Sequence, residues 1–196
     1  GKGKAGLNQH IFKVTSDKYP KWFYYFWTLK YLDNFIEIAA KAKAASKKIA
    51  TLSGEIKNKA LLNIAEELKQ HKTKIFEANK MDLQAALPKV ESGELSKSVF
   101  NRLKLDENKM RDMIQGILDI SELEDPIGKI LLKRQLDEGL ILTKKSCPIG
   151  VLGIIFEARP DVISQISALA IKSSNAVILK GGKESINTNK SIMSVI

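Results

Sequence analysis

The amino-acid sequence predicts an α/β protein in which helices come first, a β-hairpin follows, and a strand–helix–strand unit ends the chain. Apolar residues recur at helical spacing from residue 34 to about residue 120. Two short strand patterns then flank a turn signal, and two apolar runs near the C-terminus enclose an amphipathic segment. The last observation fixes the class, because two buried strands joined by a helix form a parallel βαβ unit.

Composition narrows the classes of function. The chain has 196 residues, enough to bury a sizeable core. Its single cysteine, Cys147, excludes an internal disulfide and favours a reducing compartment, so we expect a cytoplasmic protein. The apolar block at 22–27 is far too short to span a bilayer, and we expect no membrane partner. Only two histidines, His10 and His71, are present, and we expect no metal site.

The net charge of +10 raises the question of nucleic-acid binding. Residues 1–30 hold six lysines and one aspartate, which accounts for +5 and leaves +5 for the rest of the chain. Beyond residue 30, lysine and glutamate are mixed as on ordinary solvated helix faces. We therefore expect no nucleic-acid partner.

Residues 32–127 are predicted to form a helical N-terminal part. Asn34 with Glu37 matches a capping box, and an apolar stripe follows at spacings of three and four up to Leu52. Three later helices each begin at a short polar residue that can accept from the first backbone amides. These predicted caps are Ser53, Thr73 and Asp106.

Residues 128–146 are predicted to form a β-hairpin. Short strand patterns occupy residues 130–135 and 140–145, on either side of Asp137-Glu138-Gly139, which is typical of a turn. The exposed edges of a hairpin need cover, either from the same domain or from another subunit. The residues leave both arrangements open.

Residues 147–196 are predicted to form an incomplete βαβ unit. The apolar run at 151–156 indicates a strand buried on both faces, and residues 176–179 form a second such run. Residues 161–172 lie between them with helical spacing. The predicted buried face of this helix is formed by Val162, Ile166, Leu169 and Ala170.

Ligands of such units bind beyond the carboxyl ends of the parallel strands. The two candidate edges are Glu157-Ala158-Arg159-Pro160 and Lys180-Gly181-Gly182-Lys183. Paired glycines allow a backbone to approach a ligand closely, and flanking ammonium groups suit a phosphate. Neither of the glycine-rich nucleotide fingerprints is present, so the pattern indicates a nucleotide or phosphate ligand, or a bare turn with solvated lysines.

Several segments resemble the gamma-glutamyl phosphate reductase family within the aldehyde dehydrogenase superfamily. The first two are Pro148-Ile149-Gly150-Val151 and residues 155–160, whose Glu-Ala-Arg-Pro element is similar to these reductases rather than to the wider superfamily. The third comprises Lys172-Ser173 and residues 175–182, which end in Lys-Gly-Gly. Residues 78–83 and 101–106 are also similar, and the first of these links the early helices to the rest of the fold in aldehyde dehydrogenases.

The resemblance implies an aldehyde dehydrogenase-like fold, in which N-terminal helices and a β-hairpin precede the first part of a Rossmann-type NADP-binding domain, here truncated. It implies that Lys180 meets the adenosine ribose and that Lys183 meets the 2′-phosphate. Arg159 either contacts an anionic substrate or forms a structural ion pair. The full set of implied NADP(H)-binding residues is Phe156, Glu157, Ala158, Arg159, Pro160, Lys180, Gly181, Gly182, Lys183 and Ser185.

The implied reaction is the NADPH-dependent reduction of L-glutamyl 5-phosphate to L-glutamate 5-semialdehyde, with release of phosphate, in proline biosynthesis. A cysteine thiolate displaces phosphate from the acyl group, and hydride transfer then releases the aldehyde. The resemblance places this cysteine downstream of residue 196, so we assign no catalytic residue within the chain and expect it to be an inactive fragment. Cys147 is expected to be a small buried residue at a strand start.

The resemblance also implies partners and a boundary. We expect an acyl phosphate substrate, a homo-oligomeric full-length form joined through residues 128–146, and functional pairing with glutamate 5-kinase. Residues 1–31 hold nine of the thirteen aromatic residues without regular periodicity. Because the resemblance begins near Leu32, we interpret residues 1–31 as an atypical leader, with the hypothesis that they are not native.

Two alternatives come from other classes of protein. One is a basic helical interaction module, and the other is a nucleotide-binding module without catalysis. Neither explains why the Pro-x-Gly-Val, Glu-Ala-Arg-Pro and Lys-Gly-Gly elements occur together and in that order.

Overall fold

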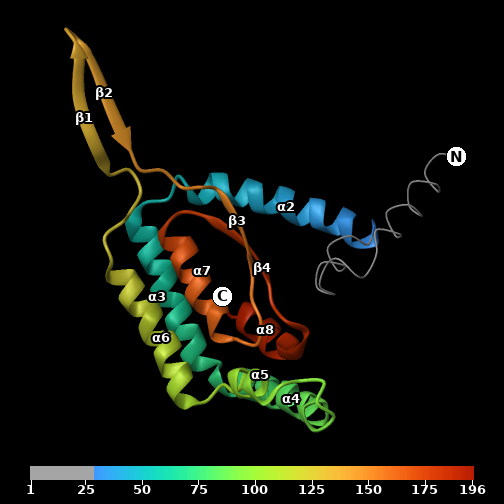
Figure 1. Cartoon of the computed structure of the whole chain (residues 1–196). Helices are drawn as coiled ribbons and strands as arrows, with labels where there is room; N and C mark the ends of the chain where they lie inside the picture. The colour runs from blue at the N-terminus through green and yellow to red at the C-terminus, as the bar shows by residue number, and fades with distance from the viewer. Residues whose placement is uncertain (1–28) are drawn as a thin grey trace, which may run out of the picture. The chain divides into compact units, whose positions relative to one another are not determined.

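The computed structural model describes residues 29–196, with side chains from residue 35 onward (Figure 1). The chain divides into two compact units, Gly1–Lys41 and Ala42–Ile196. Helix α2 (Leu29–Ile49) is the first described element, and the second unit holds all later elements. The predicted leader at residues 1–31 lies outside the described residues except for its last three positions.

Four further helices precede the strands. They are α3 (Gly54–Gln70), α4 (Lys72–Glu91), α5 (Lys97–Leu103) and α6 (Glu107–Glu122). Two predicted caps are confirmed, since the Ser53 side chain accepts from the Ile56 amide and Asp106 accepts from the Lys109 amide. Helix α5 was not predicted, although Ser96 caps it in the same way through the Val99 amide.

The other two predicted helix starts are wrong. Helix α2 begins at Leu29, so Asn34 and Glu37 lie inside the helix rather than at its N-terminus. Helix α4 begins at Lys72, which makes Thr73 its second residue. Only His71 separates α3 from α4. This connection leaves no extended residue whose side chain could cap α4, and helix spacing simply continues across it.

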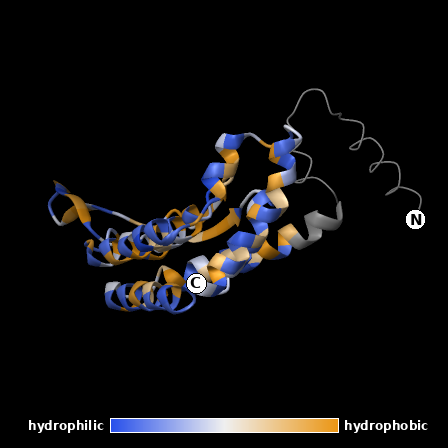
Figure 2. Ribbon diagram, turned by 90° about the horizontal axis from the view of Figure 1, so that it is seen from below, coloured by the Kyte–Doolittle hydropathy of each residue, from blue (hydrophilic) through white to orange (hydrophobic). Residues whose placement is uncertain are grey.

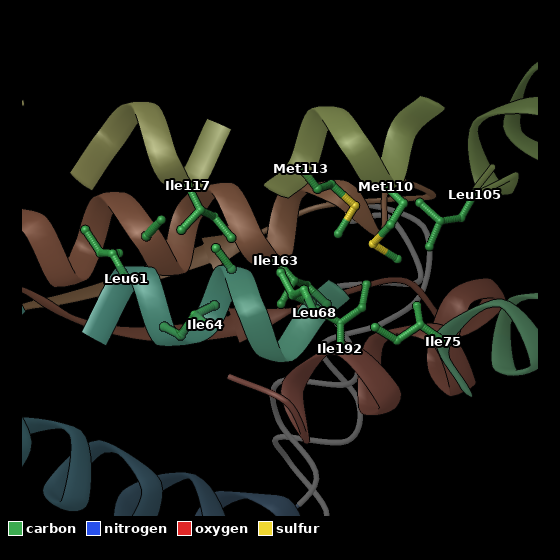
Figure 3. Packing of buried hydrophobic residues seen from close by; sticks show 12 residues of the cluster. Leu61, Ile64, Leu68, Ile75, Leu105, Met110, Met113, Ile117, Ile163 and Ile192 are labelled. Carbon is green, nitrogen blue, oxygen red and sulfur yellow. The ribbon is translucent and has the colours of Figure 1, made fainter. Parts of the chain in front are cut away.

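The hydrophobic core of the second unit lies between α3, α6 and α7 (Asp161–Lys172) (Figure 3). Leu61 and Leu68 of α3 and Ile117 of α6 are fully buried there. Burying a side chain of this size stabilises the folded state by about 1.5–3 kcal/mol. The remaining members of the cluster are Ile64, Ala65, Ile75, Leu105, Met110, Met113, Ile163, Ala168 and Ile192.

The helices of this unit are amphipathic, with hydrophobic and hydrophilic positions alternating along each ribbon (Figure 2). For α7, the predicted buried face is correct only in part, since Val162 and Ile166 are half-buried. Ala170 is buried, but Leu169 is 48% exposed and the buried face instead includes Ser164, Ser167 and Lys172. Lys172 is buried together with its hydrogen-bond partners Asn58 and Ser121, which the periodicity of apolar residues does not reveal.

The predicted β-hairpin is confirmed. Strands β1 (Ile130–Asp137) and β2 (Leu140–Lys145) pair antiparallel around a two-residue loop, in which Gly139 has φ of 74°. The backbone position with positive φ favours glycine in such a turn. Every residue of both strands is exposed, so the hairpin extends away from the helices of its own unit (Figure 1).

The predicted βαβ unit is also confirmed. Strands β3 (Val151–Ile155) and β4 (Ala176–Lys180) pair in parallel, with α7 as the crossover. A short 3-10 turn, η2 (Lys183–Ser185), and helix α8 (Ile186–Met193) follow. The prediction that both strands are buried on both faces is wrong, since Ile155 is 57% exposed. A sheet of two strands has two open edges and more face than one crossover helix can cover.

No helix between residues 29 and 196 combines the length and the apolar composition that a membrane span needs.

Candidate functional site

Both predicted ligand-binding loops lie at the same edge of the parallel sheet, where β3 and β4 end (Figure 1). Ile155 pairs with Lys180, the last residue of β4, and the Phe156 amide donates to the Lys180 carbonyl at 3.0 Å. Residues 157–160 therefore leave the sheet beside residues 181–185. This is the edge at which parallel sheets of this class bind ligands.

The first loop, residues 157–160, alternates between exposed and buried positions. Glu157 and Arg159 are exposed, whereas Ala158 and Pro160 are buried. Ala158 has φ of 46°, in the left-handed region that residues other than glycine rarely adopt. The loop thus presents two charged side chains to solvent and is anchored by the two residues between and after them.

Arg159 forms an ion pair with the first residue of the following helix. Its Nη2 atom lies 2.9 Å from Oδ2 of Asp161, the first residue of α7, and the arginine side chain is 54% exposed. This pair is one of the two interpretations that the sequence left open. The Asp161 side chain is 17% exposed, so water screens the pair mainly on the side of the arginine.

The second loop places two lysines at the surface of this edge. Lys180 and Lys183 are both exposed, and the Lys180 ammonium group donates to the Gly181 carbonyl at 3.2 Å. Ser185 is fully buried, and its hydroxyl accepts a hydrogen bond from the side-chain amide of Asn189 at 3.0 Å. The lysines therefore supply positive charge, while Ser185 supports the loop from inside.

Each glycine of the second loop faces a side chain of the chain itself. A Cβ atom on Gly181 would overlap the Asn189 amide and lie 3.1 Å from the Phe156 ring. A Cβ atom on Gly182 would overlap the carboxylate of Glu184. The sequence indicates that these glycines let a ligand approach the backbone. The structure adds a second reason for glycine at both positions, because a larger residue would collide with a neighbouring side chain.

Glu184 joins the two loops and was missed by sequence reasoning. Its Oε1 atom accepts a hydrogen bond from the Ala158 amide at 2.9 Å, across the edge of the sheet. An acidic residue just before a helix is typical of any helix start. No signal in the sequence therefore distinguishes Glu184 from an ordinary first-turn carboxylate.

Two buried polar residues of α4 hold the start of α8, directly after the second loop. The Asp82 carboxylate accepts four hydrogen bonds, from the backbone amides and side chains of Asn187 and Thr188, at 2.6 to 3.1 Å. The Asn79 side chain donates to the Thr188 hydroxyl and accepts from the Leu105 amide. The predicted link between residues 78–83 and the rest of the fold is confirmed.

A second buried network joins α3, α7 and the segment after α6. The ammonium group of Lys57 lies 2.6 Å from the Asp125 carboxylate and donates to the Ser174 hydroxyl at 3.0 Å. The ammonium group of Lys172 donates to the Asn58 side chain at 2.7 Å. Lys57 and Lys172 are only 1% and 3% exposed, so their charges depend on these partners.

The network shifts two pKa values. Burial opposes the charge of Asp125, but the hydrogen bond from Lys57 and the Ile127 amide outweigh it, so the pKa of Asp125 lies below its ordinary value. Burial lowers the pKa of Lys172, an effect that Asp125 opposes and Lys57 reinforces. The cluster holds two lysines for one carboxylate, and it belongs to the helical core rather than to the strand edge.

Other chemical groups lie away from this edge. Cys147 is exposed and precedes β3, so the prediction that it is buried is wrong. The hollow of about 530 Å³ along α3 and α6 and the hollow of about 400 Å³ between α4 and α8 include no residue of the two loops. Within residues 29–196, the His, Cys, Asp and Glu side chains form no cluster that could hold a metal ion.

Comparison with curated proteins gives close relatives that share one name. The gamma-glutamyl phosphate reductase of Brachyspira hyodysenteriae is 58% identical over 161 residues, which are 82% of this chain and 37% of that protein. The protein of the same name from Synechococcus sp. (strain JA-2-3B'a(2-13)) is 48% identical over 155 residues, which are 79% of this chain and 34% of that protein. No family model matches the chain.

Comparison with solved structures gives the same name. The gamma-glutamyl phosphate reductase of Saccharomyces cerevisiae matches with a TM-score of 0.76 and 45% identity, over 81% of this chain and 40% of that one. The protein of the same name from Thermotoga maritima matches with a TM-score of 0.76 and 33% identity, over 82% of this chain and 38% of that one. The chain therefore spans well under half of the length of the relatives that it matches.

Proposed function

Because the chain belongs to the gamma-glutamyl phosphate reductase family, we propose that it forms the helical part and the cofactor-binding edge of an enzyme that reduces L-glutamyl 5-phosphate with NADPH. The products are L-glutamate 5-semialdehyde and phosphate, which places the reaction in proline biosynthesis. The observation that carries the proposal is the shared edge of β3 and β4, where both loops meet and both lysines are exposed.

The residues at this edge fit the phosphate-bearing part of a dinucleotide. Lys180 and Lys183 supply exposed positive charge beyond the carboxyl ends of two parallel strands, as an anionic ligand requires. Ala158 and Ser185 are fully buried, so their role is to shape the loops rather than to contact the ligand. When bound, NADPH would supply the hydride that reduces the acyl group.

The nucleophile of the proposed reaction does not come from the described part of this chain. Cys147 lies before β3, at the end of the strand opposite the two loops. A five-residue strand at about 3.3 Å per residue is roughly 16 Å long, and Cys147 lies beyond its far end. We therefore propose that the 196-residue chain by itself binds cofactor without turnover.

The β-hairpin is proposed to join subunits of the whole enzyme. Both strands are exposed along their full length, and they carry a run of large apolar residues. An apolar two-stranded arm without cover from its own unit favours pairing with another chain. These exposed apolar residues are Ile130, Leu131, Leu132, Leu136, Leu140, Ile141 and Leu142.

A cofactor titration tests the proposed function. The purified chain is titrated with NADPH and with NADH, and binding is followed by the fluorescence of the nicotinamide. We expect tighter binding of NADPH, and at least about tenfold weaker NADPH binding for Lys183→Glu, in which a carboxylate replaces the ammonium group.

Lys59→Glu serves as the matched control, because Lys59 is an exposed lysine of α3 that lies outside the two loops. It changes the net charge by the same amount and is expected to leave the NADPH affinity unchanged. Equal affinity of the wild-type chain for both cofactors, or an unchanged affinity in Lys183→Glu, would contradict the assignment of NADP(H).

A further inference from the structure

The contact between Glu184 and Ala158 crosses from one loop of the proposed cofactor edge to the other. The donor is a backbone amide in the loop after β3, and the acceptor is a side chain in the turn after β4. The two strands are already paired up to Ile155 and Lys180. The Glu184 bond therefore extends the connection between the two segments beyond the last backbone pair of the sheet.

The residues on both sides of this contact, Gly182 and Ala158, have features that the contact requires. Gly182 has no side chain, and a Cβ atom there would overlap the carboxylate of Glu184. Ala158 is fully buried and has φ of 46°, a conformation that persists only where the surroundings hold it. An amide in that position needs an acceptor, and a carboxylate gives a stronger hydrogen bond than a neutral group does.

The turn that carries Glu184 is itself fixed from the helical part of the unit. Ser185, the next residue, is fully buried and accepts from Asn189. Asn187 and Thr188 donate to Asp82 of α4. Glu184 is thus a side chain that extends from a firmly held turn toward a strained loop.

We propose that Glu184 is a positioning residue of this edge, which holds the loop after β3 at a fixed separation from the loop after β4. The inference rests on the proposed function in one respect, because a fixed separation matters for cofactor binding only if both loops face the same dinucleotide. The carboxylate acts through the Ala158 amide and does not contact the ligand.

Amide hydrogen exchange of the 196-residue chain tests the proposal without any ligand. In Glu184→Ala we expect exchange in residues 156–160 to be faster by about tenfold or more, because the Ala158 amide loses its acceptor. In Glu184→Gln the side-chain oxygen still accepts, so exchange returns most of the way to the wild-type rate. Equal exchange in Glu184→Ala and the wild type overturns the proposal.

One control and one substitute variant keep the exchange experiment decisive. Glu91→Ala removes an exposed carboxylate at the end of α4 and is expected to change nothing in residues 156–160. If Glu184→Ala does not fold, Glu184→Asp takes its place, because it keeps the charge and shortens the side chain by one methylene group. The same faster exchange is then expected.

NADPH titration of the same variants tests the role in binding. We expect Glu184→Ala to bind NADPH about tenfold more weakly than the wild type and Glu184→Gln to remain near the wild-type affinity. Equal affinities in Glu184→Ala and the wild type overturn the positioning role. If the wild-type chain does not bind NADPH, the proposed cofactor assignment fails, and the exchange rates alone decide whether Glu184 holds the loops.

Discussion

The Asp82 carboxylate of α4 accepts hydrogen bonds from both the backbone amide and the hydroxyl of Thr188, at 2.7 and 2.6 Å. A residue of the early helices thus caps a helix that lies 106 positions later in the chain. The carboxylate is 3% exposed and sits at the N-terminus of α8, where a negative charge is favoured. The turn that carries Lys183 and Glu184 ends where this cap begins.

Replacement of Asp82 by asparagine is expected to lower the free energy of unfolding by about 2–4 kcal/mol. The amide group has one acceptor oxygen and would turn an NH₂ group toward donors that now meet the second carboxylate oxygen. Urea unfolding followed by far-UV circular dichroism measures the change. Asp112→Asn is the matched control, since Asp112 is an exposed residue of α6, and a similar loss in that variant would contradict the assignment.

Gly182→Ala is expected to destabilise the chain by about 0.5–1.5 kcal/mol, because the added methyl group displaces the Glu184 carboxylate and breaks its hydrogen bond with the Ala158 amide. The backbone of Gly182, with φ of −67°, accepts alanine without strain. In a Glu184→Ala background the same substitution should therefore cost much less. Thermal unfolding of the four variants gives the coupling between the two positions. Additive effects would show that the two residues do not contact each other.

Lys57→Met is expected to destabilise the chain by about 2–3 kcal/mol at neutral pH, because the Asp125 carboxylate and the Ser174 hydroxyl lose a buried partner. Asp125 is partly exposed, so water compensates for some of the loss. Lys59→Met, at an exposed position of the same helix, is the control. Chemical unfolding of both variants at one pH makes the comparison.

The ion pair between Lys57 and Asp125 also predicts that the stability of the chain falls at acid pH. The pKa of Asp125 in the folded chain is below its ordinary value of 3.8, so the folded state binds fewer protons than the unfolded state in this range. The stability that the pair contributes is complete above pH 3.8 and is lost as the pH falls through the lower, folded pKa. In Lys57→Met the loss of stability below pH 3.8 should be less steep. Parallel acid unfolding curves for the two proteins would rule out this role of the pair.

The hairpin predicts self-association that depends on its apolar surface. Leu132 pairs with Lys144 and Leu142 pairs with Arg134, so the two leucines lie on one face of the hairpin. Leu132→Lys combined with Leu142→Lys should shift the chain to a monomer in sedimentation experiments without changing its far-UV spectrum. Thr143→Lys changes an exposed polar residue of β2 and should leave the self-association unchanged. A wild-type chain that is already monomeric would contradict self-association of this chain through the hairpin.

Local signals were enough to predict much of this fold. Ser53 and Asp106 were correctly identified as caps because each needs only the amide three residues later. The hairpin and the βαβ unit followed from turn residues and short apolar runs. Thr73 failed for a related reason, because the sequence does not reveal that the chain turns at His71 alone and leaves no separate cap residue.

The errors concern residues whose environment depends on distant partners. The face of α7 was misjudged because Lys172 is buried by Asn58 and Ser121, which precede it by 114 and 51 positions. The sequence does not reveal the role of Glu184, because its partner is the Ala158 amide of another loop. The site residues were predicted to share one edge, and they do, since that placement follows from parallel strands alone. The side-chain contacts that hold this edge together, such as that of Glu184, do not follow from the parallel strands.

The buried lysines give the folded state a chemical signature. From residue 35 onward most lysine side chains are exposed and would react at once with an acylating reagent. Lys57 and Lys172 are enclosed by α3, α7 and their shared partners, so a reagent reaches them only after these helices separate. Modification of those two side chains would therefore report the opening of the core, peptide by peptide, in a background of lysines that carry no such information.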